Sequence, residues 1–384
     1  MGALSGYRVL DLTDEKGMLG ARLLADMGAE VIRVEKPGVL SGRDTPGFHY
    51  LNAGKRSISL DLEKETGREL FRRLVGTADV LVETEPPGYL ASLGLGYPEL
   101  GQINPGLVMA AITDFGQSGP YRDYKSCDLV AAALGGWMYV SGEPQAPLKP
   151  SGNQAYYSAS LFAANSILLA LWHRHAIGRG QYIDISVMEC VAATLDHVLV
   201  RYFSEGAVAK RQGSRHWNNA FRLFTCRDGY ILLSLFRQWE TLVEWLESEG
   251  MAEDLTDEKW RDSETRLKGL DHIVDVLERW TMSHTAAELV EKGQMMRFPW
   301  AEAASIAGLV QNPQLAERGY FAAVEYPETG KRYQAPGAPL KMNRSPWQAG
   351  GMVPKPGEHN LDIYHRELGL SEPEIEALVK EGAI

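Results

Sequence analysis

The sequence predicts an α/β protein that contains a mostly parallel sheet. Two observations support this prediction. Short apolar runs alternate with segments of helical periodicity through the first third of the chain, and the intervening helical segments are about ten residues long. Strands separated by helices of this length are typical of βαβ units, whose strands pair in parallel. After residue 225 the sequence pattern changes to helical segments rich in charged residues, which indicates a second, smaller domain.

The first predicted strand is Arg8–Leu12, a short apolar run. A helix over Met18–Met27 follows, with leucines at helical spacing, and Gly28 stands where a helix commonly ends. Later elements are expected in this order: strand Glu30–Glu35, strand Ser57–Asp61, helix Lys64–Leu74, strand Ala78–Glu83 and strand Leu107–Ile112. This is a Rossmann-like beginning.

The segment Tyr157–His175 is apolar nearly all round. A helix of this pattern is buried against other protein, either in the core or at a subunit interface. Gly178–Gln181 ends it, and Tyr182–Val187 alternates like a strand.

The rest of the chain divides into a helical part and an extended part. A turn and strand over Thr225–Ser234 precede helices expected at Gln238–Glu249, Asp271–Thr281 and Thr285–Lys292. Beyond Tyr320 the chain is rich in proline and glycine, so we expect an extended segment that wraps over a surface. A last helix is expected over Ser371–Glu381.

Composition excludes several classes of function. The chain has 384 residues, a formal net charge of −11 and a pI near 5.4, which argues against broad electrostatic binding of nucleic acid. Its three cysteines are too few and too scattered for a disulfide framework. We expect no membrane-spanning helix and no signal peptide, and hence a soluble cytoplasmic protein.

Two kinds of site are disfavoured by spacing. Gly17 and Gly20 could end a G-x-G-x-x-G dinucleotide motif, but Glu15 then occupies the first glycine position, where a carboxylate would repel a pyrophosphate. His173 and His175 lie two residues apart and would point to opposite sides of a helix. The sequence predicts no metal site.

Seven stretches in order carry a resemblance to a known family. They are Leu23–Gly38, Leu51–Leu62, Ala78–Glu83, Leu93–Tyr97, Ile112–Tyr121, Gly178–Gln181 and Pro356–His359. Together they make the chain resemble the family III CoA-transferases, the carnitine dehydratase and bile-acid-inducible operon F family. The resemblance runs from residue 6 to the C-terminus and so covers essentially the whole chain.

The resemblance implies a fold and a chemistry. The fold is a large Rossmann-like domain formed by both chain ends (1–200 and 330–384), a small α+β domain (225–320) and linkers (201–224 and 321–345). Two subunits of the family interlock like chain links. The chemistry moves CoA between carboxylic acids: an aspartate attacks the acyl-CoA thioester, an enzyme–acyl anhydride and CoA thiolate form, and the acceptor acid completes the exchange.

The sequence departs from the family at the nucleophile. The resemblance places Tyr156 where the family has its aspartate, four residues before a position that holds Ser160. A phenol with a pKa near 10 is protonated at neutral pH and cannot form the anhydride. The racemase branch of the family pairs that aspartate with a histidine, and here Cys127 stands in the histidine's place, before Asp128. We therefore predict no catalytic residue in this chain.

Contacts to CoA carry over unevenly. Lys36 and Lys125 match basic positions that meet the CoA nucleotide in relatives, and Leu60 and Asp61 belong to a backbone segment beside the adenine. Ser92 replaces an arginine that is usual near the phosphates in the family. The loss of that arginine should weaken CoA binding. Coenzyme A is expected as substrate in the form of acyl-CoA.

Some members of the family have two homologous subunits, of which one lacks the aspartate. Through Asp11–Gly17 and Gln154–Tyr157 the chain most resembles the aspartate-lacking subunit of enzymes that activate benzylsuccinate. We predict the non-catalytic subunit of such a heteromer, which uses, for example, succinyl-CoA and an aromatic or substituted succinate, and whose partner carries the aspartate. Two alternatives remain: a CoA-ester-binding regulatory homologue without catalysis, and a homodimeric enzyme with different CoA-ester chemistry.

Overall fold

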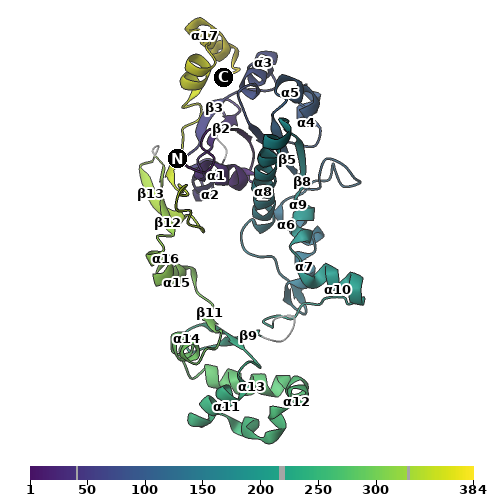
Figure 1. Cartoon of the computed structure of the whole chain (residues 1–384), viewed down its shortest axis with the longest axis vertical. Helices are drawn as coiled ribbons and strands as arrows, with labels where there is room; N and C mark the ends of the chain where they lie inside the picture. The colour runs from purple at the N-terminus through teal and green to yellow at the C-terminus, as the bar shows by residue number, and fades with distance from the viewer. Residues whose placement is uncertain (40–41, 216–220, 327–328) are drawn as a thin grey trace. The chain divides into compact units, whose positions relative to one another are not determined.

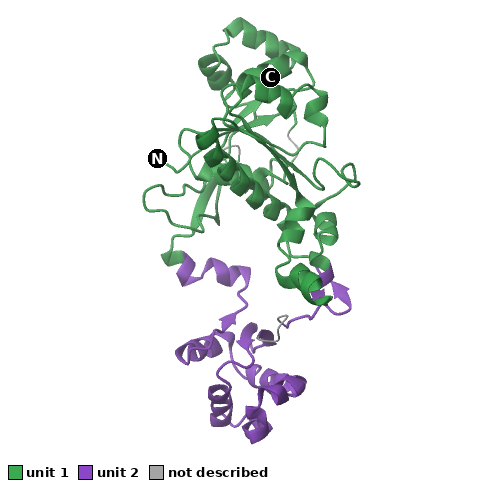
Figure 2. Ribbon diagram, turned by 45° about the vertical axis from the view of Figure 1, so that its right-hand side comes forward, with its two compact units in different colours: residues 1–138, 149–208, 316–384 green, residues 139–148, 209–315 purple. Residues whose placement is uncertain are grey.

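The chain forms two compact units in the computed structural model, which describes residues 1–39, 42–215, 221–326 and 329–384. Unit 1 comprises residues 1–138, 149–208 and 316–384, and unit 2 comprises residues 139–148 and 209–315 (Figure 2). Both ends of the chain therefore belong to unit 1.

Unit 1 is built on a six-stranded sheet in the order β3-β2-β1-β4-β5-β8. Figure 1 labels β2, β3, β5 and β8 of this sheet. Every neighbouring pair in it is parallel. The strands are β1 Arg8–Leu12, β2 Glu30–Glu35, β3 Arg56–Ser59, β4 Val80–Glu83, β5 Val108–Thr113 and β8 Tyr182–Ser186. The predicted α/β fold with a parallel sheet is confirmed, and the strand order reverses direction between β1 and β4.

Helices cover both faces of this sheet. Side chains alternate along each strand, so that Val9 packs with α1 and α8 on one face and Leu10 packs toward α3 on the other. The first face is covered by α1 Met18–Asp26, α6 Asp128–Leu134, α8 Gln154–Ile177 and α9 Val187–Ala193. The second face is covered by α3 Glu65–Val75, α5 Tyr97–Ile103 and C-terminal segments that include the π-helix Leu361–Glu367.

The central helix α8 packs closely on α1 and β5 because small residues line its inner side. At the contact with α1, a Cβ added to Gly20 would lie 2.9 Å from the carbonyl oxygen of Ser160. Among the described residues, α8 is long and apolar enough to cross a membrane, but 56% of its most apolar window is buried inside the chain. The predicted apolar helix is confirmed, and Leu169 and Trp172 on its outer side are exposed.

The C-terminal part of unit 1 contains strands that the sequence analysis missed. Within the segment predicted as an extended linker, β12 Phe321–Tyr326 pairs antiparallel with β13 Lys331–Pro336, and β14 Gly351–Met352 joins β12. The chain then returns to the sheet, where Asn360 Oδ1 accepts a hydrogen bond from the Ser59 backbone N–H at 2.9 Å. The predicted last helix is α17, Glu372–Glu381.

Unit 2 has a core of its own, in which Trp245, Trp280 and Trp300 contact one another. Its main elements are β9 Phe221–Thr225, β10 Tyr230–Ser234, β11 Ala301–Glu302, α11 Trp239–Ser248, α12 Ser263–Lys268, α13 Leu270–Thr281 and α14 Ala286–Met295. The three helices predicted after residue 238 are confirmed as α11, α13 and α14. Shorter elements of the two units are α2 Pro46–Asn52, α4 Tyr89–Ser92, α7 Trp137–Val140, β6 Gly142–Glu143, β7 Ala146–Pro147, α10 His197–Glu205, α15 Ile306–Val310 and α16 Pro313–Glu317.

Candidate active site

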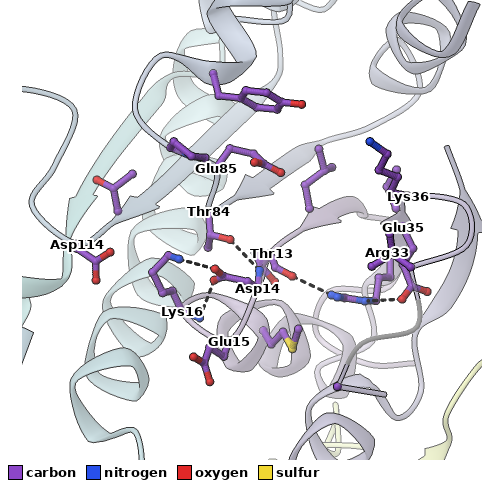
Figure 3. A pocket seen from close by; sticks show the side chains of 18 of the residues that line it. Thr13, Asp14, Glu15, Lys16, Arg33, Glu35, Lys36, Thr84, Glu85 and Asp114 are labelled. Carbon is purple, nitrogen blue, oxygen red and sulfur yellow. Dashed lines mark hydrogen bonds and ion pairs between the residues drawn. The ribbon is translucent and has the colours of Figure 1, made fainter. Parts of the chain in front are cut away.

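A cavity of about 1180 Å³ opens in unit 1 at the carboxyl ends of β1, β2, β4 and β5 (Figure 3). Ligands of open parallel sheets bind at this edge, where the strand order reverses. The loop after β1 contributes Thr13 to Lys16, and the segments after β4 and β5 contribute Thr84 to Pro87 and Asp114. The reversal between β1 and β4 thus leaves room for a ligand of considerable size.

Side-chain hydrogen bonds fix the loop after β1. Asp11 accepts hydrogen bonds from the Thr13 backbone N–H at 2.9 Å and from its hydroxyl at 2.6 Å. The backbone N–H of Asp14 donates to the Thr84 hydroxyl across the strand reversal at 2.7 Å. A Cβ on Gly17 would lie 2.6 Å from Thr13 Cγ2, so only glycine fits there. The loop therefore holds its charged side chains at defined positions in the cavity.

Buried ion pairs lie beneath the β1–β2 end of the cavity. Lys55 Nζ is 2.7 Å from Asp11 Oδ2, and both side chains are fully buried. Arg33 lies 3.6 Å from the same carboxylate and donates to the Thr13 carbonyl at 3.0 Å. Burial lowers the pKa of Lys55 to about 8 against the attraction of Asp11. Burial alone would raise the pKa of Asp11, but Lys55 and Arg33 hold it below its ordinary value.

All four residues predicted to contact CoA line this cavity. Leu60 is buried in its wall, whereas Lys36 is half exposed and lies 2.8 Å from Glu63 and 3.9 Å from Asp61. The hydrogen bond to Glu63 raises the pKa of Lys36. Lys125 is exposed and pairs with no carboxylate in the described part of the chain. Whether these residues bind CoA stays a prediction, but the fold brings them to one place.

A model of one protein family matches almost the whole chain. Its description is CoA-transferase family III, and it matches residues 4–360. The chain belongs to CoA-transferase family III.

Individual members of the family are similar to this chain over nearly its whole length. It is 36% identical to the BbsE subunit of succinyl-CoA:(R)-benzylsuccinate CoA-transferase from Thauera aromatica, over 99% of this chain and 98% of that protein. It is 31% identical to the β subunit of succinyl-CoA–L-malate CoA-transferase from Chloroflexus aurantiacus, over 98% and 96%. A CAIB/BAIF family protein from Brucella suis has a similar structure, with a TM-score of 0.86, 29% identity and coverage of 95% and 99%.

The family III resemblance assigns the nucleophile's place to Tyr156, near the start of α8. This side chain is 4% exposed. Burial raises the pKa of Tyr156 far above its ordinary value, and the charges of Asp114 and Glu15 raise it further. Tyr156 is not among the residues that line the cavity, although Asn153 and Tyr157 on either side of it are. The phenol thus stays protonated behind the cavity wall.

A carboxylate at the start of α8, that of Asp128, is already engaged. Asp128 Oδ1 accepts a hydrogen bond from the Tyr156 backbone N–H at 3.1 Å, and its Oδ2 is 2.9 Å from Lys149 Nζ. Asp128 therefore satisfies one of the backbone N–H groups at the helix N-terminus, where an anion is favoured. Cys127, which precedes it, is exposed. With both oxygens engaged, Asp128 is poorly placed to attack a thioester.

Sequence reasoning missed several charged residues of the cavity. Arg33, Arg43 and Arg122 line it, whereas Ser92, the residue expected to leave the CoA phosphates short of a cation, does not. The Ser92 hydroxyl instead donates to the Tyr89 carbonyl at 2.7 Å. The position of Arg33 in the sequence could have indicated its place, because it lies near the carboxyl end of the predicted strand Glu30–Glu35, and parallel sheets bind ligands at that end. No group of three His, Cys, Asp or Glu side chains suited to a metal ion occurs in the described ranges.

Proposed function

We propose that this chain is the subunit without a nucleophile in a heteromeric family III CoA-transferase that moves CoA between carboxylic acids. The observation that carries the proposal is Tyr156, buried and protonated where the family resemblance expects an aspartate. A homologous partner would supply that aspartate, whose carboxylate attacks the acyl-CoA thioester, releases CoA thiolate and forms an acyl anhydride for the acceptor acid. We expect the complex to be cytoplasmic.

The relatives support a heteromer and suggest its substrates. One is named as subunit BbsE of a benzylsuccinate CoA-transferase, and two others are the α and β subunits of a malate CoA-transferase. All three names include succinyl-CoA. We therefore propose succinyl-CoA as the donor of the complex and an aromatic or substituted succinate as the acceptor.

Exposed apolar side chains in unit 1 support a partner subunit. Leu169 and Trp172 on α8 and Val200 and Phe203 on α10 are each at least 65% exposed. Within each helix the two side chains lie three residues apart and so share a face, and exposed apolar surface of this kind is suited to contact with a partner. We propose that they face the partner in an interlocked dimer with the family's domain organisation. Light scattering of the purified chain should find a dimer. A stable folded monomer at micromolar concentration would contradict the interlocked dimer.

A co-expression experiment tests the proposal. The chain is purified alone and together with a homologue that has an aspartate at the position of Tyr156, and each sample is assayed for CoA exchange between succinyl-CoA and benzylsuccinate. We expect activity only from the complex, with hydroxylamine trapping an acyl adduct on the partner. Turnover that requires an acylated carboxylate of this chain would overturn the proposal.

A further inference from the structure

The end of the cavity nearest α8 carries an excess of negative charge. The carboxylates of Asp14, Glu15, Glu85 and Asp114 lie around Lys16, while Lys36 and Arg33 lie across the cavity (Figure 3). Lys16 forms an ion pair with Asp14 and acts at longer range on Glu85 and Asp114, so one cation lies among four carboxylates. We call the part of the wall formed by Glu15, Glu85, Thr113 and Asp114 the acidic end.

The acidic carboxylates lack cationic partners in the part of the chain that the structure describes. Glu15 accepts a hydrogen bond from the neutral Asn153 amide at 3.0 Å. Glu85 and Asp114 form no ion pair with any described residue, and Asp114 Oδ1 is buried without a hydrogen-bond partner there. Burial raises the pKa of both Glu85 and Asp114, and the Asp14 charge adds to this rise. Lys16 opposes the rise for both groups, and a hydrogen bond from Ser126 opposes it for Asp114, but the net pKa of each is raised. These groups are therefore poorly compensated inside the chain.

A second polar group at this end also lacks a partner. Thr113, the last residue of β5, is 4% exposed and lines the cavity, yet its hydroxyl has no hydrogen-bond partner among the described residues. A buried hydroxyl without a partner costs free energy that a bound molecule can recover. The acidic end is thus suited to receive a ligand group that hydrogen-bonds and carries no negative charge.

We propose that the acidic end binds the acyl part of a CoA ester and selects against acyl groups that carry a free carboxylate. The inference rests on the proposed function, because it takes the CoA ester to lie with its acyl group toward Tyr156. The free carboxylate of such an acyl group would lie among Glu15, Glu85 and Asp114 in a partly buried site, where like charges repel strongly. An acyl group that ends in a methyl group avoids this repulsion, and one that ends in an ammonium group gains attraction.

The selectivity has a consequence for a heteromer. Succinyl and benzylsuccinyl thioesters each keep one free carboxylate, so this chain's own cavity is the less favourable place for them. The two subunits would then differ in the acyl groups that they accept, and the dicarboxylic CoA ester would bind at the partner that holds the nucleophile.

Three CoA esters with the same spacing test the proposal. Succinyl-CoA, butyryl-CoA and β-alanyl-CoA place a carboxylate, a methyl group and an ammonium group after the same acyl carbonyl and two methylenes. Titration calorimetry on the purified full-length chain should rank their affinities as β-alanyl-CoA, then butyryl-CoA, then succinyl-CoA. We expect succinyl-CoA to bind at least about tenfold more weakly than butyryl-CoA, since one such repulsion is worth this much at a protein's effective dielectric.

Matched variants locate the effect. Asp114→Asn and Glu85→Gln should each strengthen succinyl-CoA binding severalfold, and by more than they strengthen the binding of free CoA. Glu63→Gln, across the cavity beside Lys36, is the control and should change CoA and all three esters alike. Circular dichroism confirms that each variant is folded.

Each outcome decides the inference separately from the proposed function. Equal affinities for succinyl-CoA and butyryl-CoA would overturn the selectivity. Absence of binding for every ester would overturn the inference too. In both cases the co-expression assay still decides whether the chain completes an active transferase.

Discussion

The β1–β2–β3 half of the sheet ends in charges that pair with one another, whereas β4 and β5 end in carboxylates without ion-pair partners among the described residues. On the first half, Asp11 pairs with Lys55, and Glu35 pairs with Arg43. On the second half, Glu85 and Asp114 border the same cavity with raised pKa values. Removal of one partner of a buried ion pair destabilises a fold. A buried charge without a partner costs free energy that a bound ligand can recover. The difference assigns mainly structural work to one half and selectivity to the other.

Breaking the buried pair should have the largest effect. Lys55→Met leaves the fully buried Asp11 carboxylate without its closest cation, and loss of one partner of such a pair costs about 3–5 kcal/mol of unfolding free energy. Urea denaturation measures this loss. As a control, Lys268→Met removes an exposed pair with Glu264 and should change little. A loss no larger than the control's would show that the first half of the sheet does not depend on its paired charges.

The second half should show a dependence of stability on pH. Burial raises the pKa of Glu83, at the end of β4, from 4.5 to about 8. The folded chain holds this proton more tightly than the unfolded chain. The resulting stability is therefore complete below about pH 4.5 and is lost as the pH rises through about 8. The loss amounts to about 2–4 kcal/mol after allowance for solvent relaxation.

Glu83→Gln tests this dependence because it removes the titrating group and keeps the shape. Denaturation between pH 5 and pH 9 should show a smaller decline in stability for this variant than for the unaltered chain. Glu69→Gln, at an exposed position on α3, should leave the decline unchanged. Parallel curves for Glu83→Gln and the unaltered chain would mean that Glu83 is already ionised in the fold.

Much of the fold could be predicted because apolar runs report burial directly. The sheet strands were placed within a few residues, for example Ser57–Asp61 for the observed β3, Arg56–Ser59. The strands Phe321–Tyr326 and Lys331–Pro336 were missed because the surrounding proline and glycine residues suggested an extended chain. Their pairing is a tertiary contact that composition does not encode.

The site could be predicted only in part. Lys36, Leu60, Asp61 and Lys125 came from the family resemblance and do line one cavity. Asp114 was missed, although it lies two residues after the predicted strand Leu107–Ile112 and so stands at the edge where parallel sheets bind ligands. The lack of a partner for its buried oxygen could not be foreseen, because it depends on every side chain that packs around it.

A restored nucleophile should depend on the acidic end. Tyr156→Asp places a carboxylate beside Asp128, which already satisfies one of the backbone N–H groups at the helix N-terminus, and near Asp114 and Glu15. Ionisation of the new group is therefore opposed, and we expect little acylation by butyryl-CoA. Adding Asp114→Asn should raise acylation by about tenfold or more, because one like charge is removed.

Mass spectrometry after incubation with butyryl-CoA measures the adduct, and hydroxylamine should remove it. Tyr156→Asn is the control and should give no adduct with or without Asp114→Asn. If Tyr156→Asp alone is acylated as readily as the double variant, the carboxylates of the second half do not suppress ionisation at this place.

The smallest effects are expected at Lys36 and Lys125, two exposed lysines that line the cavity. Each substitution to alanine should weaken CoA binding by about two- to fivefold, since solvent screens exposed charges.

The two lysines should differ when Glu63 is altered as well. Lys36 lies 2.8 Å from Glu63, so Lys36→Ala both removes a cation and leaves that carboxylate facing the phosphates. Glu63→Gln should therefore restore part of the affinity lost in Lys36→Ala, and calorimetry of the double variant measures it. In Lys125→Ala, which breaks no ion pair with a described residue, Glu63→Gln should shift CoA affinity only as much as it does in the unaltered chain. Equal restoration in both backgrounds would mean that Lys36 and Glu63 act on CoA independently.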